Sequence, residues 1–211
     1  MPDWDEIFRR EGRVFRQPHS AMPGITQLLR ESGARRVLDL GCGTGRHLVY
    51  LASQGFETYG LDASGTAISM SSEWLDREGL RAEIRTHRME EPFPYSDGFF
   101  DGLISIQVLH HNMMKDILVT VGEIARVLKP RGLLFVTVPL PRPTPIHPED
   151  DWKLEPVEPG TYIPRAGRES GIPHHYFTSE EIPIVFSPFD IVENFLDDNG
   201  RHRCLLGWKK P

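Results

Sequence analysis

Hydrophobic residues between positions 25 and 139 follow two spacings in turn. Short apolar runs, typical of strands buried on both faces, predict strands at residues 35–41, 57–64, 100–106 and 132–139, and a weaker pattern predicts one more at 82–87. Between these runs, apolar residues recur every three or four positions and predict helices at residues 25–32, 45–55, 64–79 and 114–128. The chain therefore alternates strands and helices with short connections.

This alternation predicts a parallel sheet covered by helices on both faces. Near the C-terminus, "TSEEIPIVFS" predicts a short helix, and "DIVENFLDD" and "HRCLLGWKK" predict two strands joined by the tight turn "DNG". The predicted fold class is α/β: a Rossmann-like, doubly wound, mostly parallel seven-stranded sheet with a C-terminal antiparallel hairpin. In such a sheet the ligand binds beyond the carboxyl ends of the strands, where the strand order reverses.

Two segments fall outside this pattern. Residues 1–20 have no clean period, and we expect them to form an arm or lid. Nine of the chain's 18 prolines lie in residues 139–173, which argues against a helix or an interior strand there. We expect residues 141–177 to be an ordered surface insert of turns and extended segments, within a single domain that covers residues 21–211.

The composition narrows the range of functions. The chain of 211 residues has a formal net charge of −6 with scattered basic residues, which argues against a nucleic-acid substrate and favours a small molecule. No apolar run reaches the length of a membrane span, and the first residues are charged, so we expect neither a membrane association nor a secretory signal. The two cysteines give no disulfide framework, which fits a cytoplasmic location. The oligomeric state stays open.

The segment "VLDLGCGTGRH" at residues 37–47 is a glycine-rich turn between the first predicted strand and a helix. Gly41, Gly43 and Gly45 allow the backbone to turn sharply and to approach a ligand closely. A dinucleotide site also carries three glycines, but its third glycine comes one residue later. Asp62, which closes the second strand, is placed to bind ribose hydroxyls. Asp39 could hold a zwitterionic amino-acid tail but would repel a pyrophosphate.

Four segments carry a more specific signal through their order and spacing. They are "VLDLGCGTG", "YGLDAS", "PFPYSDGFFDGLISIQVLHH" and "RVLKPRGLLFVTVP", and together they span about residues 34–140. They resemble the motifs at the first, second, fourth and fifth strands of the class I S-adenosylmethionine-dependent methyltransferases. The resemblance implies an enzyme that binds S-adenosyl-L-methionine, transfers its methyl group to an acceptor and releases S-adenosyl-L-homocysteine.

The resemblance also implies a set of cofactor-binding residues. They are Asp39, Gly41, Cys42, Gly43, Gly45, Asp62, Ala63, Met89, Glu90 and Gln107. In this assignment Asp39 positions the amino-acid tail, Asp62 binds the ribose, and Gln107 lies near the methionine part. Many relatives carry an acid before the hydrophobic residue that flanks adenine, but here Arg88 precedes Met89. Either Glu90 or the backbone around Met89 then contacts the adenine amino group.

Two histidine pairs are candidates for the acceptor pocket. His110 and His111 follow the fourth predicted strand, and His174 and His175 end the proline-rich insert, the two regions that wall the acceptor pocket in this family. A hydroxyl or ammonium acceptor needs a proton removed, so a catalytic histidine would help there. The alternative is that these residues brace loops. Adjacent histidines point in different directions and no i, i+4 pair accompanies them, so we predict no metal site.

Three functions are compatible with these observations. The first is methyl transfer to a small-molecule acceptor, with residues 141–177 covering the acceptor pocket. The second is a non-catalytic sensor or assembly protein of the same fold that binds the cofactor. The third is a nicotinamide-dependent oxidoreductase, against which Asp39 and the early third glycine count.

Overall fold

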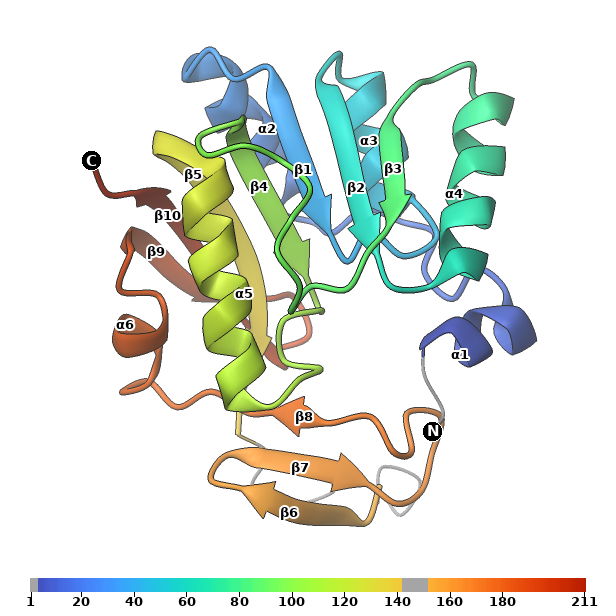
Figure 1. The fold of residues 1–211 in the computed structure, drawn as a ribbon, viewed down its shortest axis with the longest axis vertical. Coiled ribbons are helices and arrows are strands. Elements are labelled where there is room, and N and C mark those ends of the chain that lie inside the picture. The colour runs from blue at the N-terminus through green and yellow to red at the C-terminus, as the bar shows by residue number, and fades with distance from the viewer. Residues whose placement is uncertain (1–3, 142–151) are drawn as a thin grey trace.

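The main layer of the protein is a seven-stranded sheet. A computed structural model describes residues 4–141 and 152–211 and gives the strand order β3-β2-β1-β4-β5-β10-β9 (Figure 1). The strands are β1 (Arg36–Leu40), β2 (Glu57–Asp62), β3 (Glu83–Thr86), β4 (Phe100–Ile106), β5 (Leu128–Pro139), β9 (Phe189–Leu196) and β10 (His202–Lys209). The first five run parallel, and β10 is antiparallel to both β5 and β9. This confirms the predicted fold class, the C-terminal hairpin included.

Helices cover both faces of the sheet (Figure 1). They are α2 (Met22–Glu31), α3 (Arg46–Ser53), α4 (Gly65–Arg77), α5 (Met114–Val127) and α6 (Ile182–Val185), with α1 (Trp4–Glu11) below the sheet. On one face, Ile117 and Ile124 of α5 are fully buried in a core that includes the central strands. On the other face, a second core contains Met22 and Leu29 of α2 and Leu51 of α3. Because both faces are buried, most residues of the central strands are apolar, and polar residues such as Asp39 of β1 and Asp101 of β4 lie near the strand ends.

The local sequence explains where the helices next to β1 and β2 begin. Ser64 caps α4, and its hydroxyl accepts a hydrogen bond from the Ala67 amide at 3.0 Å. Gly45 precedes α3 in the left-handed conformation, with φ of 95°. Both helices therefore begin immediately after the carboxyl ends of strands, with their N-termini at the same edge of the sheet.

The insert forms a second, small antiparallel sheet. Its strands are β6 (Leu154–Glu158), β7 (Thr161–Pro164) and β8 (His174–His175), in the order β6-β7-β8. The prediction that no interior strand runs through this segment is wrong for β7. Pro164 is its last residue and Pro156 lies in an edge strand, and a missing amide donor is tolerated at such positions. Residues 142–151 of the expected insert and residues 1–3 of the expected arm lie outside the described residues.

The insert is bonded to the loops at the carboxyl edge of the main sheet. The His175 amide donates to the His110 carbonyl at 2.8 Å, and the Phe177 amide donates to the Pro139 carbonyl at 3.2 Å. The insert therefore lies below the strand ends in Figure 1, on the side where α1 also lies.

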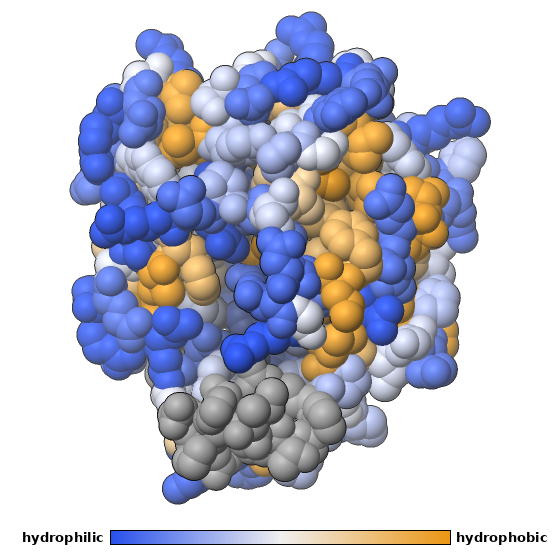
Figure 2. Space-filling view, turned by 180° about the vertical axis from the view of Figure 1, so that it is seen from behind, coloured by the Kyte–Doolittle hydropathy of each residue, from blue (hydrophilic) through white to orange (hydrophobic). Residues whose placement is uncertain are grey.

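The opposite face of the molecule is mostly hydrophilic. Figure 2 shows hydrophobic side chains gathered in a few patches there, the larger ones on the half of the molecule that holds β9 and β10. Among the described residues, no helix is both long and apolar enough to cross a membrane.

Candidate cofactor and acceptor site

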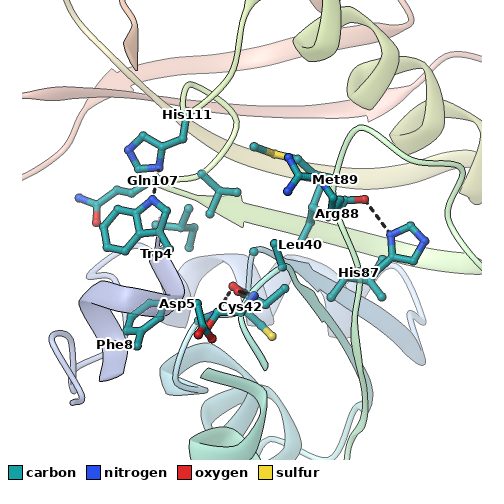
Figure 3. Close-up of a pocket in the computed structure, with 18 of the residues that line it drawn as sticks. Trp4, Asp5, Phe8, Leu40, Cys42, His87, Arg88, Met89, Gln107 and His111 are labelled. Carbon is teal, nitrogen blue, oxygen red and sulfur yellow. Dashed lines mark hydrogen bonds between the residues drawn. The ribbon is translucent and has the colours of Figure 1, made fainter. Parts of the chain in front are cut away.

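A cavity of about 490 Å³ lies at the carboxyl ends of β1, β2 and β4. The last residues of these strands, Leu40, Asp62 and Ile106, all line it. Figure 3 shows α1 and the loop after β4 on one side of the cavity and the loop after β3 on the other. The cavity thus lies where the strand order reverses between β1 and β4, the expected ligand position in an open α/β sheet.

The glycine loop forms the floor of the cavity through close backbone packing. Gly41 has φ of 72°, and a Cβ there would come within 2.4 Å of both Val108 methyl groups. Gly45 has φ of 95°, and a Cβ there would come within 2.9 Å of the Ser71 hydroxyl. Gly41 and Gly43 line the cavity, whereas Gly45 lies outside its lining and turns the chain into α3. At Gly41 and at Gly45, both the backbone conformation and the packing therefore require a glycine.

Asp62 faces the cavity with its carboxylate held by backbone amides. Its Oδ2 accepts from the Gly43 amide and its Oδ1 from the Ser64 amide, each at 2.8 Å. Burial raises the pKa of Asp62, although these two amides act to lower it. Each oxygen still has a lone pair available, so the carboxylate can also accept hydrogen bonds from two hydroxyl groups of a ligand.

Asp39 is a buried carboxyl group with no hydrogen-bond partner among the described residues. Its side chain is 1% exposed, and its Oδ2 lies 3.9 Å from His47 Nδ1, beyond hydrogen-bond distance. Burial raises the pKa of Asp39 to about 8, against the influence of the nearby Arg46. Asp39 does not line the cavity, but His47 does. An unpartnered carboxyl group in this position would be stabilised by a cationic group of a ligand.

Arg46 brings a mostly buried cation to the same end of the cavity. Its guanidinium donates to the Gln17 carbonyl and to Gln107 Oε1, each at 3.4 Å, and lies 4.8 Å from the centre of the Phe15 ring. These partners are neutral, so the guanidinium could also pair with a carboxylate of a ligand. Sequence reasoning did not assign Arg46 to the site. Its place directly after the glycine loop was the available signal.

Gln107 follows β4 in a strained backbone conformation. Its φ is 63°, a region that side-chain-bearing residues seldom occupy, and its amide donates to the Thr137 hydroxyl at 2.8 Å. Strain of this kind persists only where the surroundings hold it in place. Here it turns the Gln107 side chain into the cavity, which Gln107 lines.

The loop after β3 forms the opposite wall of the cavity. Met89 is partly buried and packs against the larger hydrophobic core. Glu90 lines the cavity, but its carboxylate is paired with the Arg88 guanidinium. The Arg88 carbonyl contacts His87 Nδ1 at 2.7 Å (Figure 3). The acid nearest the expected adenine position is thus already engaged by the arginine that precedes Met89.

The N-terminal helix α1 closes one side of the cavity. Asp5 Oδ1 accepts from the Ser64 hydroxyl at 2.7 Å and from the Thr66 amide at 2.9 Å, which lowers the pKa of Asp5 to about 2. Trp4 Nε1 donates to His111 Nδ1 at 3.0 Å (Figure 3). Trp4, Asp5 and Phe8 all line the cavity. The arm is therefore part of the site.

The four predicted histidines lie close together, but they do not all reach the cavity. Of the four, only His111 lines it. His110 and His174 lie behind His111, with ring centres 3.9 Å and 4.8 Å from that of His111. His175 is turned the other way, with its Nδ1 2.8 Å from the Thr161 hydroxyl. Burial lowers the pKa of His111 to about 3 and that of His110 well below its ordinary value.

The structure therefore brings together most of the residues assigned from the sequence. Those that line the cavity are Gly41, Cys42, Gly43, Asp62, Ala63, Met89, Glu90, Gln107 and His111. Asp39 and Gly45 lie behind the glycine loop, and His110, His174 and His175 lie behind the acceptor side. Sequence reasoning did not assign the contributions of Asp5 and Ser64, because their contact joins segments 59 residues apart.

Comparisons with known proteins identify the family. A model described as "Methyltransferase domain" matches residues 38–136. An uncharacterised methyltransferase of Synechocystis is 31% identical over 151 residues, which cover 64% of this chain and 68% of that protein. The chain belongs to the class I S-adenosylmethionine-dependent methyltransferases. Its cofactor is S-adenosylmethionine.

Solved structures share the fold of this methyltransferase. One is a SAM-dependent methyltransferase of Methanosarcina mazei, with a TM-score of 0.72 and 23% identity, covering 89% of this chain and 97% of that one. Another is the 1,6-didemethyltoxoflavin-N1-methyltransferase of Burkholderia thailandensis with bound 1,6-didemethyltoxoflavin and S-adenosylhomocysteine, with a TM-score of 0.68 and 19% identity, covering 92% and 80%.

Further curated relatives have different named roles. They include a ribosomal RNA small subunit methyltransferase of Alcanivorax borkumensis, 31% identical over 48% of this chain, and a ubiquinone biosynthesis O-methyltransferase of Rickettsia felis, 30% identical over 54%. The chain spans only 31% and 45% of the length of these two relatives. The methyl acceptor therefore does not follow from the comparisons.

The residues of the cavity fit S-adenosylmethionine. The Asp62 carboxylate can accept from ribose hydroxyls, and the Arg46 guanidinium can receive a carboxylate. The Asp39 carboxyl, buried behind the glycine loop with no hydrogen-bond partner among the described residues, can stabilise an ammonium group on the cavity side. Gly41 and Gly43 of the loop between Asp39 and Arg46 line the cavity, so their backbone is open to a ligand without an intervening side chain.

Proposed function

We propose that this methyltransferase transfers a methyl group to a small-molecule acceptor, which enters between the insert and the loop after β4. The observation that carries the proposal is the enclosure of the cavity. Gly171, Ile172 and Pro173 of the insert and the helix α1 wall it on the acceptor side. Its volume of about 490 Å³ lies in the range of small-molecule sites. The net charge of −6 supports the same choice over a nucleic acid.

In this proposal each cofactor-binding residue contacts a different part of S-adenosylmethionine. Asp62 accepts hydrogen bonds from the ribose hydroxyls, while Asp39 and Arg46 receive the ammonium and the carboxylate of the amino-acid tail. Ala63 and Met89 flank the adenine ring. Because Glu90 is paired with Arg88, the adenine amino group is left to the backbone around Met89.

The chain's own residues act mainly by placing the reactants. When bound, S-adenosylmethionine supplies an electrophilic methyl group on a positively charged sulfur. The acceptor atom has to lie in line with it, and such placement alone supplies a large part of the rate. Gln107, held in its strained conformation, and His111 stand where the methyl group and the acceptor would meet.

His111 is suited to hold the acceptor rather than to remove a proton from it. Its pKa is lowered to about 3, so it retains a proton poorly at neutral pH. Its Nδ1 lone pair is also used by the Trp4 hydrogen bond. The acceptor is therefore expected to have a nucleophilic atom that needs little help with deprotonation, such as a thiolate or an unprotonated ring nitrogen.

A screen with methyl-labelled S-adenosylmethionine tests this proposal. The full chain is incubated with separate panels of aryl thiols, nitrogen heterocycles, catechols and total RNA, and both the label and S-adenosylhomocysteine are measured. We expect turnover with members of the small-molecule panels and a loss of at least about tenfold in His111→Phe. His87→Asn, at a partly buried position on the opposite wall of the cavity, serves as the matched comparison.

Two results would contradict the proposal. Label found only in RNA would assign this chain a macromolecular acceptor. Binding of S-adenosylmethionine without turnover in any panel would favour the alternative of a non-catalytic protein that binds the cofactor.

A further inference from the structure

Three histidines from two distant segments converge next to the cavity. His110 and His111 follow β4, and His174 belongs to β8 of the insert. One ring nitrogen of each lies within 4.8 Å of the others. His110 and His174 are 4% exposed, and His111 is the member that reaches the cavity. The expectation of no metal site considered each histidine pair alone, whereas the fold brings His174 of the second pair next to His110 and His111.

One of these side chains has a buried nitrogen atom without a partner, and another has only a carboxylate beside its nitrogen. His110 Nδ1 has no hydrogen-bond partner among the described residues, and His174 Nε2 makes no hydrogen bond within them but lies 3.2 Å from Glu169 Oε2. Buried polar atoms are normally satisfied, so each of these atoms needs an explanation. A bound ion that accepts their lone pairs would supply one.

A carboxylate lies beside two of the three imidazoles. Glu169 is 7% exposed, and its Oε2 lies 3.2 Å from His174 Nε2 and 3.7 Å from His111 Nε2. Its Oε1 lies 3.4 Å from the Arg168 guanidinium. The cluster thus combines three imidazoles with one negative charge, a donor set that suits first-row divalent ions.

We propose that His110, His111 and His174 form a binding site for one divalent transition-metal ion, with Glu169 beside it. An ion at the centre of a triangle with 4.8 Å sides lies about 2.8 Å from each nitrogen, so ring shifts of about 0.7 Å reach the Zn–N distance of about 2.1 Å. Three protein ligands leave a coordination position open, as in catalytic zinc sites. The site goes beyond the proposed function, because it does not depend on the identity of the acceptor.

Metal binding and the closed position of Trp4 exclude each other. The Trp4 indole N–H donates to His111 Nδ1, so His111 carries its own proton on Nε2. If Nε2 binds the ion, the proton moves to Nδ1 and the Trp4 hydrogen bond is lost. If Nδ1 binds the ion, the Trp4 hydrogen bond to Nδ1 has to break. The N-terminal arm is therefore expected to loosen when the ion binds.

Equilibrium dialysis of the full chain against Zn²⁺, with a competing chelator, tests the site. We expect one Zn²⁺ per chain, and affinity at least about a hundredfold lower in H174A. W4F should bind Zn²⁺ about two- to tenfold more tightly, because the competing hydrogen bond is gone. H87A is the matched control, since His87 lines the same cavity on the opposite wall and should leave Zn²⁺ affinity unchanged.

X-ray absorption of the Zn²⁺-loaded parent chain decides the ligands even if H174A fails to fold. Three imidazole nitrogens in the first coordination sphere are expected. Absence of stoichiometric Zn²⁺, equal binding by H174A and H87A, or fewer than three imidazoles would overturn the proposal. Calorimetry with S-adenosylmethionine alone is run in parallel, so a failed metal site is distinguished from a failed cofactor site.

Discussion

Asp39 is the second-last residue of β1, and Asp62 is the last residue of the neighbouring strand β2. Their carboxyl groups nevertheless have different surroundings. Asp62 accepts hydrogen bonds from two backbone amides and faces the cavity, whereas Asp39 is almost fully buried and has no hydrogen-bond partner in the part of the chain that the structure describes. The sequence predicted both residues as ligands of the cofactor. It could not predict these different surroundings, because burial and amide contacts are set by the packing of the glycine loop.

Asp62→Ala is expected to weaken binding of S-adenosylmethionine by about 1–3 kcal/mol, because buried hydrogen bonds to the ribose are lost. Titration calorimetry measures the change. Asp76→Ala on the exposed side of α4 is the control and should bind as the parent does. Equal affinity in Asp62→Ala and the parent would show that the ribose assignment is incorrect.

The pKa of Asp39 predicts a pH-dependent stability of the ligand-free chain. The pKa rises from an ordinary value of 3.8 to about 8 on folding, so between these values the folded state holds one more proton than the unfolded state. The free energy of unfolding should therefore fall as pH rises from 5 to 7, by up to about 1.4 kcal/mol per pH unit from this residue. Asp39→Asn should remove this fall.

Urea denaturation of the parent and Asp39→Asn at pH 5, 6 and 7 measures this difference. The same ionisation predicts that S-adenosylmethionine binds the parent more tightly as pH rises toward 8, because its ammonium group favours the carboxylate. Parallel stability curves for the two proteins would contradict the assignment of the raised pKa to Asp39.

At the scale of elements, α1 and the insert are each bonded to the start of a helix that covers the sheet. In both cases an acidic side chain accepts hydrogen bonds from groups at the N-terminus of that helix. Asp5 of α1 accepts from the hydroxyl and amide at the start of α4. Glu158 of β6 accepts from the first amide of α5, whose own N-cap residue, Met113, makes no side-chain cap. These contacts place both segments against the cavity, and hydrophobic periodicity gives no signal for them.

Glu158→Ala should lower the stability of the protein. The Met114 amide loses its partner, and the Thr161 hydroxyl, which donates to the same oxygen at 2.9 Å, loses one of its two contacts and keeps the one with His175 Nδ1. We expect a loss of about 1–2 kcal/mol, or about 2–8 °C in melting temperature. Glu155→Ala on the same strand removes an exposed ion pair with Arg165 and should change stability by less than about 0.5 kcal/mol. Equal effects of the two substitutions would argue against the cap.

Asp5→Ala should loosen α1 from the rest of the molecule. The pKa of Asp5 is about 2 in the folded protein, below its ordinary value of 3.8. The hydrogen bonds of its carboxylate therefore stabilise the folded protein fully above about pH 4, and this contribution is lost as the pH falls toward 2. We expect faster hydrogen exchange in residues 4–11 and weaker binding of S-adenosylmethionine in Asp5→Ala. Arg10→Ala, on an exposed position of the same helix, is the control. Unchanged exchange in Asp5→Ala would mean that hydrophobic packing alone holds the arm.

At the scale of the whole molecule, two hydrophobic cores on opposite faces of the sheet fix the strand ends at which the cavity opens. The cavity is lined by α1 and by the loops after β1, β2, β3 and β4, so a ligand bound there would join segments that are separate in the chain. Binding should therefore stabilise the domain as a unit.

S-adenosylmethionine or S-adenosylhomocysteine at about 100 times its dissociation constant should raise the melting temperature by about 5–10 °C. Thermal unfolding with each compound, and with NAD as the comparison ligand, measures the shift. A shift with NAD that equals or exceeds the other two would contradict the cofactor assignment.

The order of strands and helices, the glycine loop and the position of Asp62 were determined by the sequence itself. Each depends on neighbouring residues, through hydrophobic periodicity or through the need for glycine at positive φ. The placing of α1 over the cavity, the small sheet of the insert, and the meeting of His174 with His110 and His111 were decided only by the tertiary structure. These contacts join residues far apart in the chain, and their energies depend on burial that no short segment can have on its own.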